Sequence, residues 1–342
     1  MRKVLVDEAV GMELGYDITK IVPKTEKYRA FRRGQVITRE DISILKDMGK
    51  QYVYVLGPDN NLIHEDEAAL FLAKQASGPG VTQTEPSTGR VNLVAEYDGL
   101  LKVNVKLLDQ LNNERDLVFA TLHNNRAILK GQLIAGTRVV PIAVPREVID
   151  KIEGLTAEAV PMLTIKPFLP LKVAVVTTGS EVFSGRIKDG FKDVISQKIA
   201  PFKGQLIGQS VAPDDHTLIT KEIEKFLDKG AELIFVTGGM SVDADDVTPQ
   251  GITNTSAEVV FYGAPILPGS QFMLAYKDDV PICGVPGGAL FSSKTTLDIL
   301  LPRLFANDRI EYADIVAMGH GGLCEDCKIC HFPQCPYGKA TY

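Results

Sequence analysis

Small and hydroxylated residues gather at three points in the second half of this chain, each directly after an apolar run. The three segments are 177–181 (TTGSE), 237–241 (TGGMS) and 284–288 (GVPGG). Glycines let backbone N–H groups approach an anion, and threonine and serine hydroxyls supply further donors. One such loop is common as a structural turn. Three of them at the carboxyl ends of strands in one sheet favour an anionic, phosphate-bearing ligand.

Acidic residues follow the second of these loops. Asp243, Asp245 and Asp246 place three carboxylates within four residues. Beside a phosphate they would repel the ligand unless a cation intervened, and Mg²⁺ binds one or two carboxylates together with phosphate oxygens. The segment therefore indicates a magnesium site. The alternative is a solvated acidic turn that caps a helix.

Four of the five cysteines lie close to the C-terminus, as Cys324, Cys327, Cys330 and Cys335. This C-x2-C-x2-C-x4-C spacing is one residue longer at the last gap than bacterial ferredoxin-type runs. Zinc prefers two C-x2-C pairs set further apart, although His331 could complete a Cys₃His site. An iron–sulfur cluster, a zinc ion and a redox-labile tail without metal all stay open. Cys283 lies inside an apolar run and is expected to be a buried core thiol.

The loops need a scaffold, and the sequence from 166 to 310 predicts one. LKVAVVTT, AELIFVTGG and PICGVPGG read as continuous apolar strands, which is typical of a sheet buried on both faces. Between them, 217–229 has one apolar face at helical spacing. Alternating strands and helices predict an α/β domain with a doubly wound, mostly parallel sheet.

The remaining sequence predicts three further parts. Residues 1–75 mix short strands and helices and are expected to form a small α+β domain. Residues 76–165 are expected to be a linker, rich in Gly, Pro, Ser and Thr at 76–90, followed by a β-rich domain. Residues 311–342 form the cysteine-rich tail.

Charge and hydropathy exclude several classes of protein. The 342 residues include 37 basic and 43 acidic side chains, a formal net charge of −6, which is not the footprint of a nucleic-acid-binding protein. No apolar run reaches the ~18 residues of a membrane-spanning helix. Acidic residues interrupt the N-terminal segment, so it does not read as a signal peptide. We therefore expect a cytoplasmic protein without membrane or nucleic-acid partners.

Five segments together resemble a known family. TTGSE (177–181), APDD (212–215), TGGMS (237–241), DVTP (246–249) and GVPGG (284–288) occur in this order with suitable spacing. Residues 170–305 are similar to the molybdopterin-binding domain shared by molybdopterin adenylyltransferases and molybdopterin molybdenumtransferases. Residues 9–18 are also similar to the opening of molybdenumtransferase chains.

The resemblance implies a ligand and its contacts. It implies that the loops hold the phosphate of molybdopterin and that Asp246 and Asp214 serve nucleotide and Mg²⁺ chemistry as catalytic residues. ATP or molybdate would be the second substrate, and a homo-oligomer is expected. The implied binding residues are Thr178, Gly179, Ser180, Glu181, Gly238, Gly239, Ser241, Pro286, Gly287 and Gly288.

The sequence departs from the family pattern at several points. Ser180 stands where the family has Asp or Asn, Asp243 replaces a glycine, and Gly288 stands where molybdenumtransferases have Asn. Three functions therefore stay open. The first is an enzyme that adenylylates molybdopterin or inserts molybdate, the second a non-catalytic carrier of molybdopterin or the finished cofactor, and the third a nucleotide-processing hydrolase.

Overall fold

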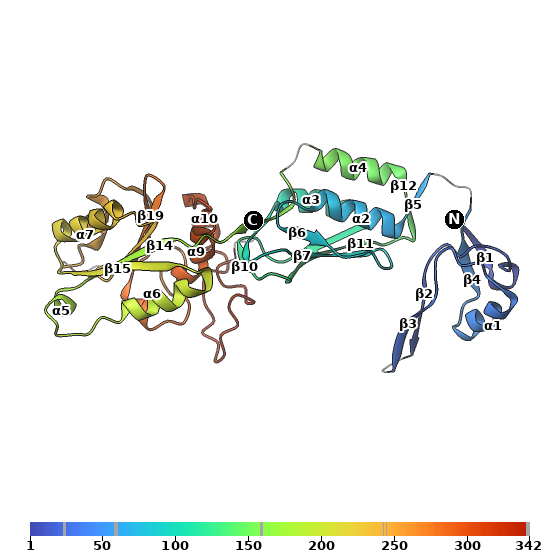
Figure 1. Cartoon of the computed structure of the whole chain (residues 1–342), viewed down its shortest axis with the longest axis horizontal. Helices are drawn as coiled ribbons and strands as arrows, with labels where there is room; N and C mark the ends of the chain where they lie inside the picture. Colours follow the sequence, from blue (N-terminus) through green and yellow to red (C-terminus); the bar gives the residue numbers. More distant parts are fainter. Residues whose placement is uncertain (23–24, 58–60, 158–159, 242, 244, 340–342) are drawn as a thin grey trace. The chain divides into compact units, whose positions relative to one another are not determined.

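The computed structural model describes residues 1–22, 25–57, 61–157, 160–241, 243 and 245–339. The described chain forms two compact units (Figure 1). Unit 1 comprises 1–96, 103–122 and 130–164, and unit 2 comprises 97–102, 123–129 and 165–342. Each unit is described by itself below. None of the described helices is long and apolar enough to cross a membrane.

A six-stranded sheet forms the centre of unit 2. Its strand order is β15-β14-β16-β19-β18-β17. The first four strands run parallel, and β18 is antiparallel to both of its neighbours. The strands are β14 (Lys172–Thr178), β15 (Gln205–Ala212), β16 (Leu233–Thr237), β17 (Glu258–Tyr262), β18 (Met273–Lys277) and β19 (Val280–Val285). The predicted α/β class and mostly parallel sheet are confirmed.

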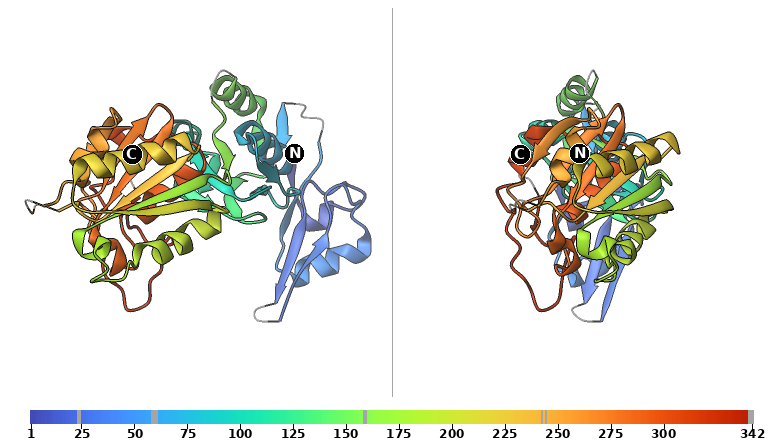
Figure 2. Two further views of the ribbon diagram at one scale, coloured as in Figure 1. Left: turned by 60° about the vertical axis from the view of Figure 1, so that its left-hand side comes forward. Right: turned by 90° about the vertical axis from the view of Figure 1, so that its left-hand side faces the viewer.

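Helices cover both faces of this sheet (Figures 1 and 2). Residues of α6 (Phe191–Ile199) and α9 (Thr296–Phe305) join the core cluster on one face, and residues of α7 (His216–Asp228) and α8 (Thr248–Thr253) join that on the other. Strand β14 serves both clusters, with Val173 and Val175 in the first and Ala174 and Val176 in the second. Its apolar run is continuous because neither face of the strand meets water.

Short elements complete unit 2. They are α5 (Ser180–Phe183), the 3-10 helices η2 (Ala200–Phe202) and η3 (Gly287–Leu290), and α10 (Tyr312–Ala317). Most of a small sheet with the order β10-β8-β13 also belongs to this unit. Its strands are β8 (Gly99–Val103), β10 (Arg126–Ile128) and β13 (Leu163–Pro167).

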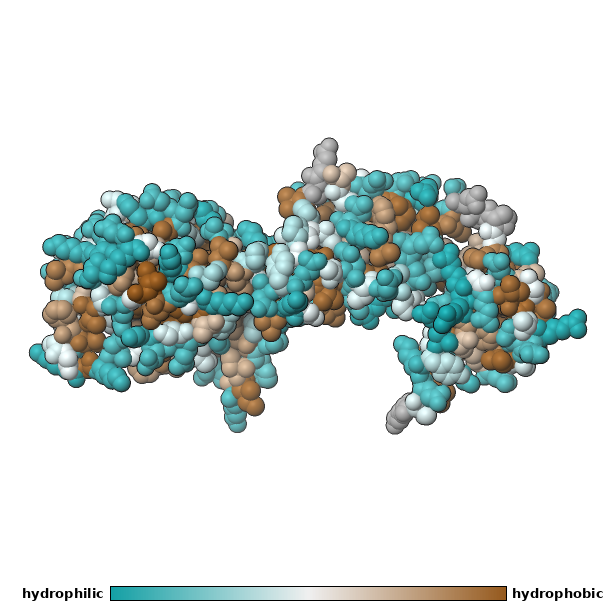
Figure 3. Space-filling model, viewed as in Figure 1, coloured by the Kyte–Doolittle hydropathy of each residue, from teal (hydrophilic) through white to brown (hydrophobic). Residues whose placement is uncertain are grey.

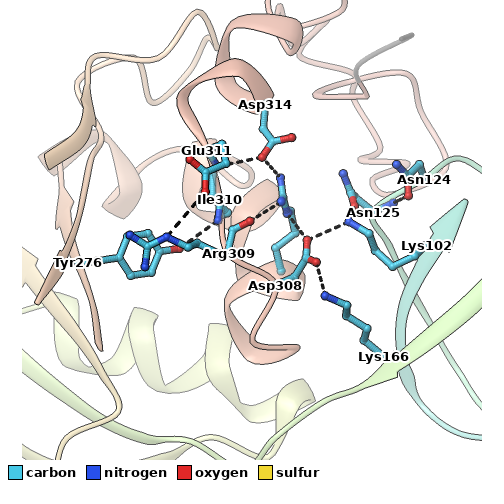
Figure 4. A network of polar contacts seen from close by, with 11 residues as sticks. Lys102, Asn124, Asn125, Lys166, Tyr276, Asp308, Arg309, Ile310, Glu311 and Asp314 are labelled. Atoms are coloured by element: carbon cyan, nitrogen blue, oxygen red, sulfur yellow. Dashed lines mark hydrogen bonds and ion pairs between the residues drawn. The ribbon is translucent and has the colours of Figure 1, made fainter. Parts of the chain in front are cut away.

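A buried carboxylate ties these strands to the end of α9. Asp308 accepts hydrogen bonds from Lys102 Nζ at 2.9 Å, Lys166 Nζ at 2.6 Å and Arg303 Nε at 2.7 Å (Figure 4). The Arg303 guanidinium also forms an ion pair with Asp314 at 2.8 Å. Three cations around one carboxylate anchor segments that are far apart in the sequence.

Unit 1 is rich in strands, as expected. Its largest sheet has the order β6-β7-β11-β9, all antiparallel, and α2 packs against β7 and β11. Strand β6 lies within 76–90, so the structure differs here from the expected linker. The elements are β5 (Leu62–His64), α2 (Glu65–Ala76), β6 (Val81–Gln83), β7 (Arg90–Ala95), α3 (Val105–Asn112), β9 (Leu117–Thr121), β11 (Leu133–Val139), β12 (Ala143–Pro145) and α4 (Arg146–Thr156).

Residues 1–57 have their own core cluster. Their elements are β1 (Arg2–Leu5), the 3-10 helix η1 (Val6–Glu8), β2 (Ile18–Val22), β3 (Glu26–Phe31), α1 (Arg39–Asp47) and β4 (Tyr52–Val55). Thr38 begins α1 with a capping box, in which its backbone N donates to Asp41 Oδ2 at 2.9 Å. The domain limits expected at residues 75, 165 and 310 stay a prediction.

Candidate functional site

The predicted binding loops lie along one edge of the unit 2 sheet. Thr178 is opposite Ala212, and Thr237 is opposite both Thr177 and Val285. The four strands are parallel, so their carboxyl ends meet at the same edge. The loops that follow, at 179–181, 213–215, 238–241 and 286–288, are therefore neighbours, as the sequence predicted.

Backbone hydrogen bonds connect these loops. Gly179 N donates to Ala212 O at 3.1 Å, Gly238 N to Val285 O at 3.1 Å, and Thr248 N to Gly239 O at 3.2 Å. Each bond joins a loop to the end of another strand or, for Thr248, to the start of α8. The edge is thus a connected frame rather than a set of independent turns.

The fold itself requires glycine in the second loop. Gly238 and Gly239 have φ values of +93° and +55°. A Cβ at Gly238 would lie 2.7 Å from Thr178 O, and one at Gly239 would lie 2.6 Å from Thr248 Oγ1. Backbone conformation and packing account for both residues without any ligand.

The third loop is different. Gly287 and Gly288 are exposed, neither has a positive φ, and a Cβ on either would meet no heavy atom within 4 Å. The buried residues Pro286 and Ala289 fix the turn on both sides. Nothing in the fold requires glycine at these two positions, so the backbone there is open to a ligand.

In the first loop, the predicted contacts have separate surroundings. Thr178 is buried, and its Oγ1 lies 3.3 Å from Thr237 O and 3.0 Å from Thr248 Oγ1. Gly179 has a φ of +134°. Ser180 and Glu181 are exposed at the start of α5. The buried Thr178 hydroxyl therefore holds the second loop in place through Thr237 and Thr248, while Ser180 and Glu181 are exposed to solvent.

The two predicted catalytic carboxylates both accept backbone hydrogen bonds. Asp214 Oδ2 accepts from Ser180 N at 2.8 Å, and Asp214 N donates to Ser180 Oγ at 3.3 Å. Asp246 Oδ2 accepts from Asp243 N at 3.1 Å. Each carboxylate therefore stabilises a turn in the structure as it stands.

Among the described residues, no group of three or more His, Cys, Asp or Glu side chains could hold a metal ion. Residues 242 and 244 of the acidic turn lie outside the described part. Asp245 is exposed and Asp246 is half-buried. Mg²⁺ at this edge would need most of its oxygen ligands from a bound phosphate and water.

Two residues beside the second loop were missed by the sequence reasoning. The Tyr262 hydroxyl, from β17, donates to Met240 O at 3.0 Å, and Gln271 Nε2 donates to Ser241 Oγ at 3.3 Å. Burial, together with the negative charge of Asp246, raises the pKa of Tyr262. Neither residue belongs to a motif, so no local signal could have found them.

Asp189 was missed too. Its Oδ2 accepts from Gln209 Nε2 at 2.6 Å, and its Oδ1 accepts from Phe191 N at 3.0 Å and Thr177 Oγ1 at 3.4 Å. It joins the start of α6 to the end of β14 and to the middle of β15. An Asp-Gly pair before an amphipathic segment is a helix-start signal that could have indicated it.

The cysteine tail divides into two pairs. Cys324 and Cys335 are half-buried against the core cluster of unit 2, whereas Cys327 and Cys330 are exposed. All four are free thiols and form no metal-binding group among the described residues. This arrangement does not fit a preformed iron–sulfur or zinc site. Cys283 is fully buried, as predicted, and burial raises the pKa of its thiol.

Comparison with known families supports the resemblance seen in the sequence. Residues 174–306 match the family model described as a probable molybdopterin binding domain. Residues 3–57 match a model described as a domain of unknown function.

Curated relatives match only part of the chain. A CinA-like protein of Thermosipho melanesiensis is 31% identical over 91 residues, which cover 26% of this chain and 22% of that protein. A protein of Archaeoglobus fulgidus is 29% identical over 82 residues, which cover 24% of this chain and 35% of that protein. The matches thus span well under half of either relative.

Solved structures with detectable likeness include the molybdopterin biosynthesis enzyme MoaB from Thermus thermophilus, at 19% identity and a TM-score of 0.34. It covers 42% of this chain and 99% of its own. The tungsten cofactor synthesizing protein MoaB from Pyrococcus furiosus is 18% identical, with a TM-score of 0.32, and covers 40% of this chain and 93% of its own.

Proposed function

We propose that unit 2 binds molybdopterin through its phosphate at the glycine-loop edge, and that the protein acts in molybdenum cofactor biosynthesis. The single observation that carries the proposal is the open backbone at Gly287 and Gly288, inside a segment that matches a molybdopterin-binding family model. Exposed backbone N–H groups in such a turn are suitable donors for a phosphate.

Two serine hydroxyls are also suited to bind an anion. Ser180 Oγ accepts a hydrogen bond from Asp214 N, and Ser241 Oγ accepts one from Gln271 Nε2. A hydroxyl that already accepts from the protein keeps its own proton to donate. Ser180 and Ser241 are both exposed at the same edge, so their protons can point to a shared ligand.

The reaction is the finer part of the proposal. In adenylylation, a phosphate oxygen of molybdopterin would attack the α-phosphorus of ATP and pyrophosphate would leave. Among the described residues of the loops, one carboxylate oxygen each of Asp246 and Asp214 accepts no hydrogen bond, and these oxygens would hold Mg²⁺ against the phosphates. The metal would offset the charge that develops on the transferred group. Molybdate insertion is the alternative reaction, and the family resemblance supports assembly into a homo-oligomer.

A carrier without catalysis is the second candidate. It is favoured by the backbone hydrogen bonds that already engage Asp214 and Asp246, and by Asp243 in place of the family glycine. A tail metal is not part of either candidate, because the four cysteines are not gathered in the structure.

Binding of molybdopterin released anaerobically from a molybdenum enzyme tests the proposal. Gly288→Val should weaken binding at least tenfold without changing stability, because its side chain would enter open space where the ligand is expected. Gly154→Ala is the matched control, since a Cβ at this α4 position also meets nothing. Equal binding by wild type and Gly288→Val would contradict the proposal.

Pyrophosphate release then separates the two candidates. Molybdopterin-dependent release of pyrophosphate from ATP would identify an adenylyltransferase. Tight binding without turnover, with either ATP or molybdate, would identify a carrier.

A further inference from the structure

Phe291 is an aromatic residue with almost no cover. Its exposed fraction is 89%, and no other large apolar side chain among the described residues is more exposed. It directly follows η3, the turn that contains Gly287 and Gly288. A ligand bound at this open backbone segment would lie beside the Phe291 ring.

The turn fixes the base of this side chain. Phe291 N donates to Gly288 O at 3.2 Å, and Ala289 N donates to Pro286 O at 3.0 Å. Pro286 and Ala289 are buried. The aromatic ring is therefore attached to a well-anchored turn, next to the proposed phosphate position.

The turn that carries Phe291 approaches the segment that follows the first loop. Leu290 Cδ2 lies 3.6 Å from the place that a Cβ on Gly190 would occupy. The segment before Gly190 exposes Phe183 at 58% and Ile187 at 52%. Leu290 of η3 therefore lies close to the end of a segment that carries these two exposed apolar side chains.

Exposed cations lie in the same segment. Arg186, Lys188 and Lys192 are all exposed, in a chain whose net charge is −6. The carboxylate of Asp189, which lies between them in the sequence, already accepts hydrogen bonds from Gln209 and Phe191. Residues 183–192 thus carry both apolar and basic exposed side chains, which suits a ligand with a flat ring at one end and a phosphate at the other. On the face shown in Figure 3, apolar residues are interspersed with hydrophilic ones.

We propose that Phe291 is a stacking platform for the bicyclic pterin ring of the ligand whose phosphate binds at the 286–288 turn. This inference rests on the proposed function and adds a specificity-determining residue to it. A planar heteroaromatic ring can bury one face of an exposed phenylalanine with favourable stacking geometry. Removing such a platform should weaken binding about tenfold, as for aromatic residues that stack on nucleobases.

The experiment uses the full chain and a pterin without phosphate. The affinity for 6-hydroxymethylpterin is measured through its own fluorescence, for wild type, Phe291→Ala, Phe291→Trp and Tyr312→Ala. Tyr312 is the matched control, an aromatic residue of the same unit on α10 that is 61% exposed. We expect Phe291→Ala to bind about tenfold more weakly, while Phe291→Trp and Tyr312→Ala bind as wild type does.

The outcomes separate this inference from the proposed function. If wild type binds neither 6-hydroxymethylpterin nor molybdopterin, the proposed function fails and the stacking role with it. If wild type binds the pterin and Phe291→Ala binds equally well, only the stacking role is overturned. Sedimentation of the same variants identifies a third result: a change in mass with unchanged pterin affinity would make Phe291 a contact between copies, which also overturns the inference.

Discussion

The hydroxyl oxygens of Thr178 and Thr248 lie 3.0 Å apart beneath the glycine loops. Thr178 ends β14 and Thr248 begins α8, and both are buried. The pair joins the end of β14 to the start of α8, and it is tied to the second loop because Thr178 Oγ1 also contacts Thr237 O and Thr248 N donates to Gly239 O. The shape of the second loop therefore depends on a contact between residues 70 positions apart.

The threonine pair can be tested by a double-mutant cycle. Thr178→Val and Thr248→Val should each lower the free energy of unfolding by about 1–3 kcal/mol, because each leaves a buried hydroxyl without its partner. The double variant should lose less than the sum of the two. Urea unfolding measures all four proteins, and strict additivity would show that the hydroxyls do not interact.

Replacing a glycine of the second loop by alanine should destabilise the protein, whereas the same change in the third loop should not. Gly239→Ala should destabilise the protein by about 1–3 kcal/mol, because a positive φ is strained for alanine and its Cβ would meet Thr248 Oγ1. Gly287→Ala, at a position with open space, should leave stability within about 0.5 kcal/mol. Thermal unfolding of the two variants makes the comparison, and similar losses would contradict the contrast drawn between the loops.

Asp308 should make the protein sensitive to acid. Burial tends to raise the pKa of its carboxyl, but hydrogen bonds from Lys166 and Lys102 and the Arg303 charge lower it to about 2. Its folded pKa lies below the unfolded value of 3.8, so its contribution is present above pH 4 and is lost as pH falls toward 2.

Asp308→Asn tests this role. Removing the carboxylate takes a counter-charge from half-buried Lys102 and Lys166 and from buried Arg303, which keeps Asp314, and should cost up to about 3–5 kcal/mol at pH 7. Unfolding followed from pH 7 to pH 2 should show a weaker acid dependence in the variant. An unchanged profile would mean that other carboxylates control the acid response.

Glu65 should have the opposite dependence. It is 9% exposed at the start of α2, and burial, with the nearby Asp66 charge, raises its pKa from 4.5 to about 7. The native state thus holds a proton that the unfolded state releases, so stability should fall as pH rises from 4.5 to 7. Glu65→Gln should be more stable than wild type at pH 8, by roughly 3 kcal/mol.

The exposed residue Glu67 on the same helix gives the control for this prediction. Glu67→Gln should preserve the slope of stability between pH 4.5 and pH 8, which is measured by urea unfolding. A wild-type stability that rises across this interval would contradict the assignment to Glu65.

The thiols should react in three classes. Cys327 and Cys330 are exposed and should be modified first by a disulfide reagent, Cys324 and Cys335 more slowly, and Cys283 only on unfolding. Mass spectrometry after timed quenching measures the order. Simultaneous protection of all four tail cysteines in anaerobically purified protein, with stoichiometric iron or zinc, would instead show that a metal gathers the tail.

Several features followed from the sequence because they depend on near neighbours. The apolar run of β14 predicted a strand buried on both faces, and Val173 and Val176 do belong to different core clusters. Parallel strands placed the glycine loops at one edge, since strand direction alone fixes where carboxyl ends meet. The isolated position of Cys283 in an apolar run was enough to predict its burial.

Other features were decided only by the tertiary structure. Gly239 and Gly287 look alike in the sequence. Packing against Thr248 requires glycine at position 239, whereas no contact requires it at position 287. The hydrogen bond from Lys102 to Asp308 joins residues 206 positions apart. The spacing of the tail cysteines did not reveal that two are half-buried and two exposed. Local spacing encodes helices, strands and turns, whereas partners across the fold depend on the register of strands and the packing of segments that no short motif records.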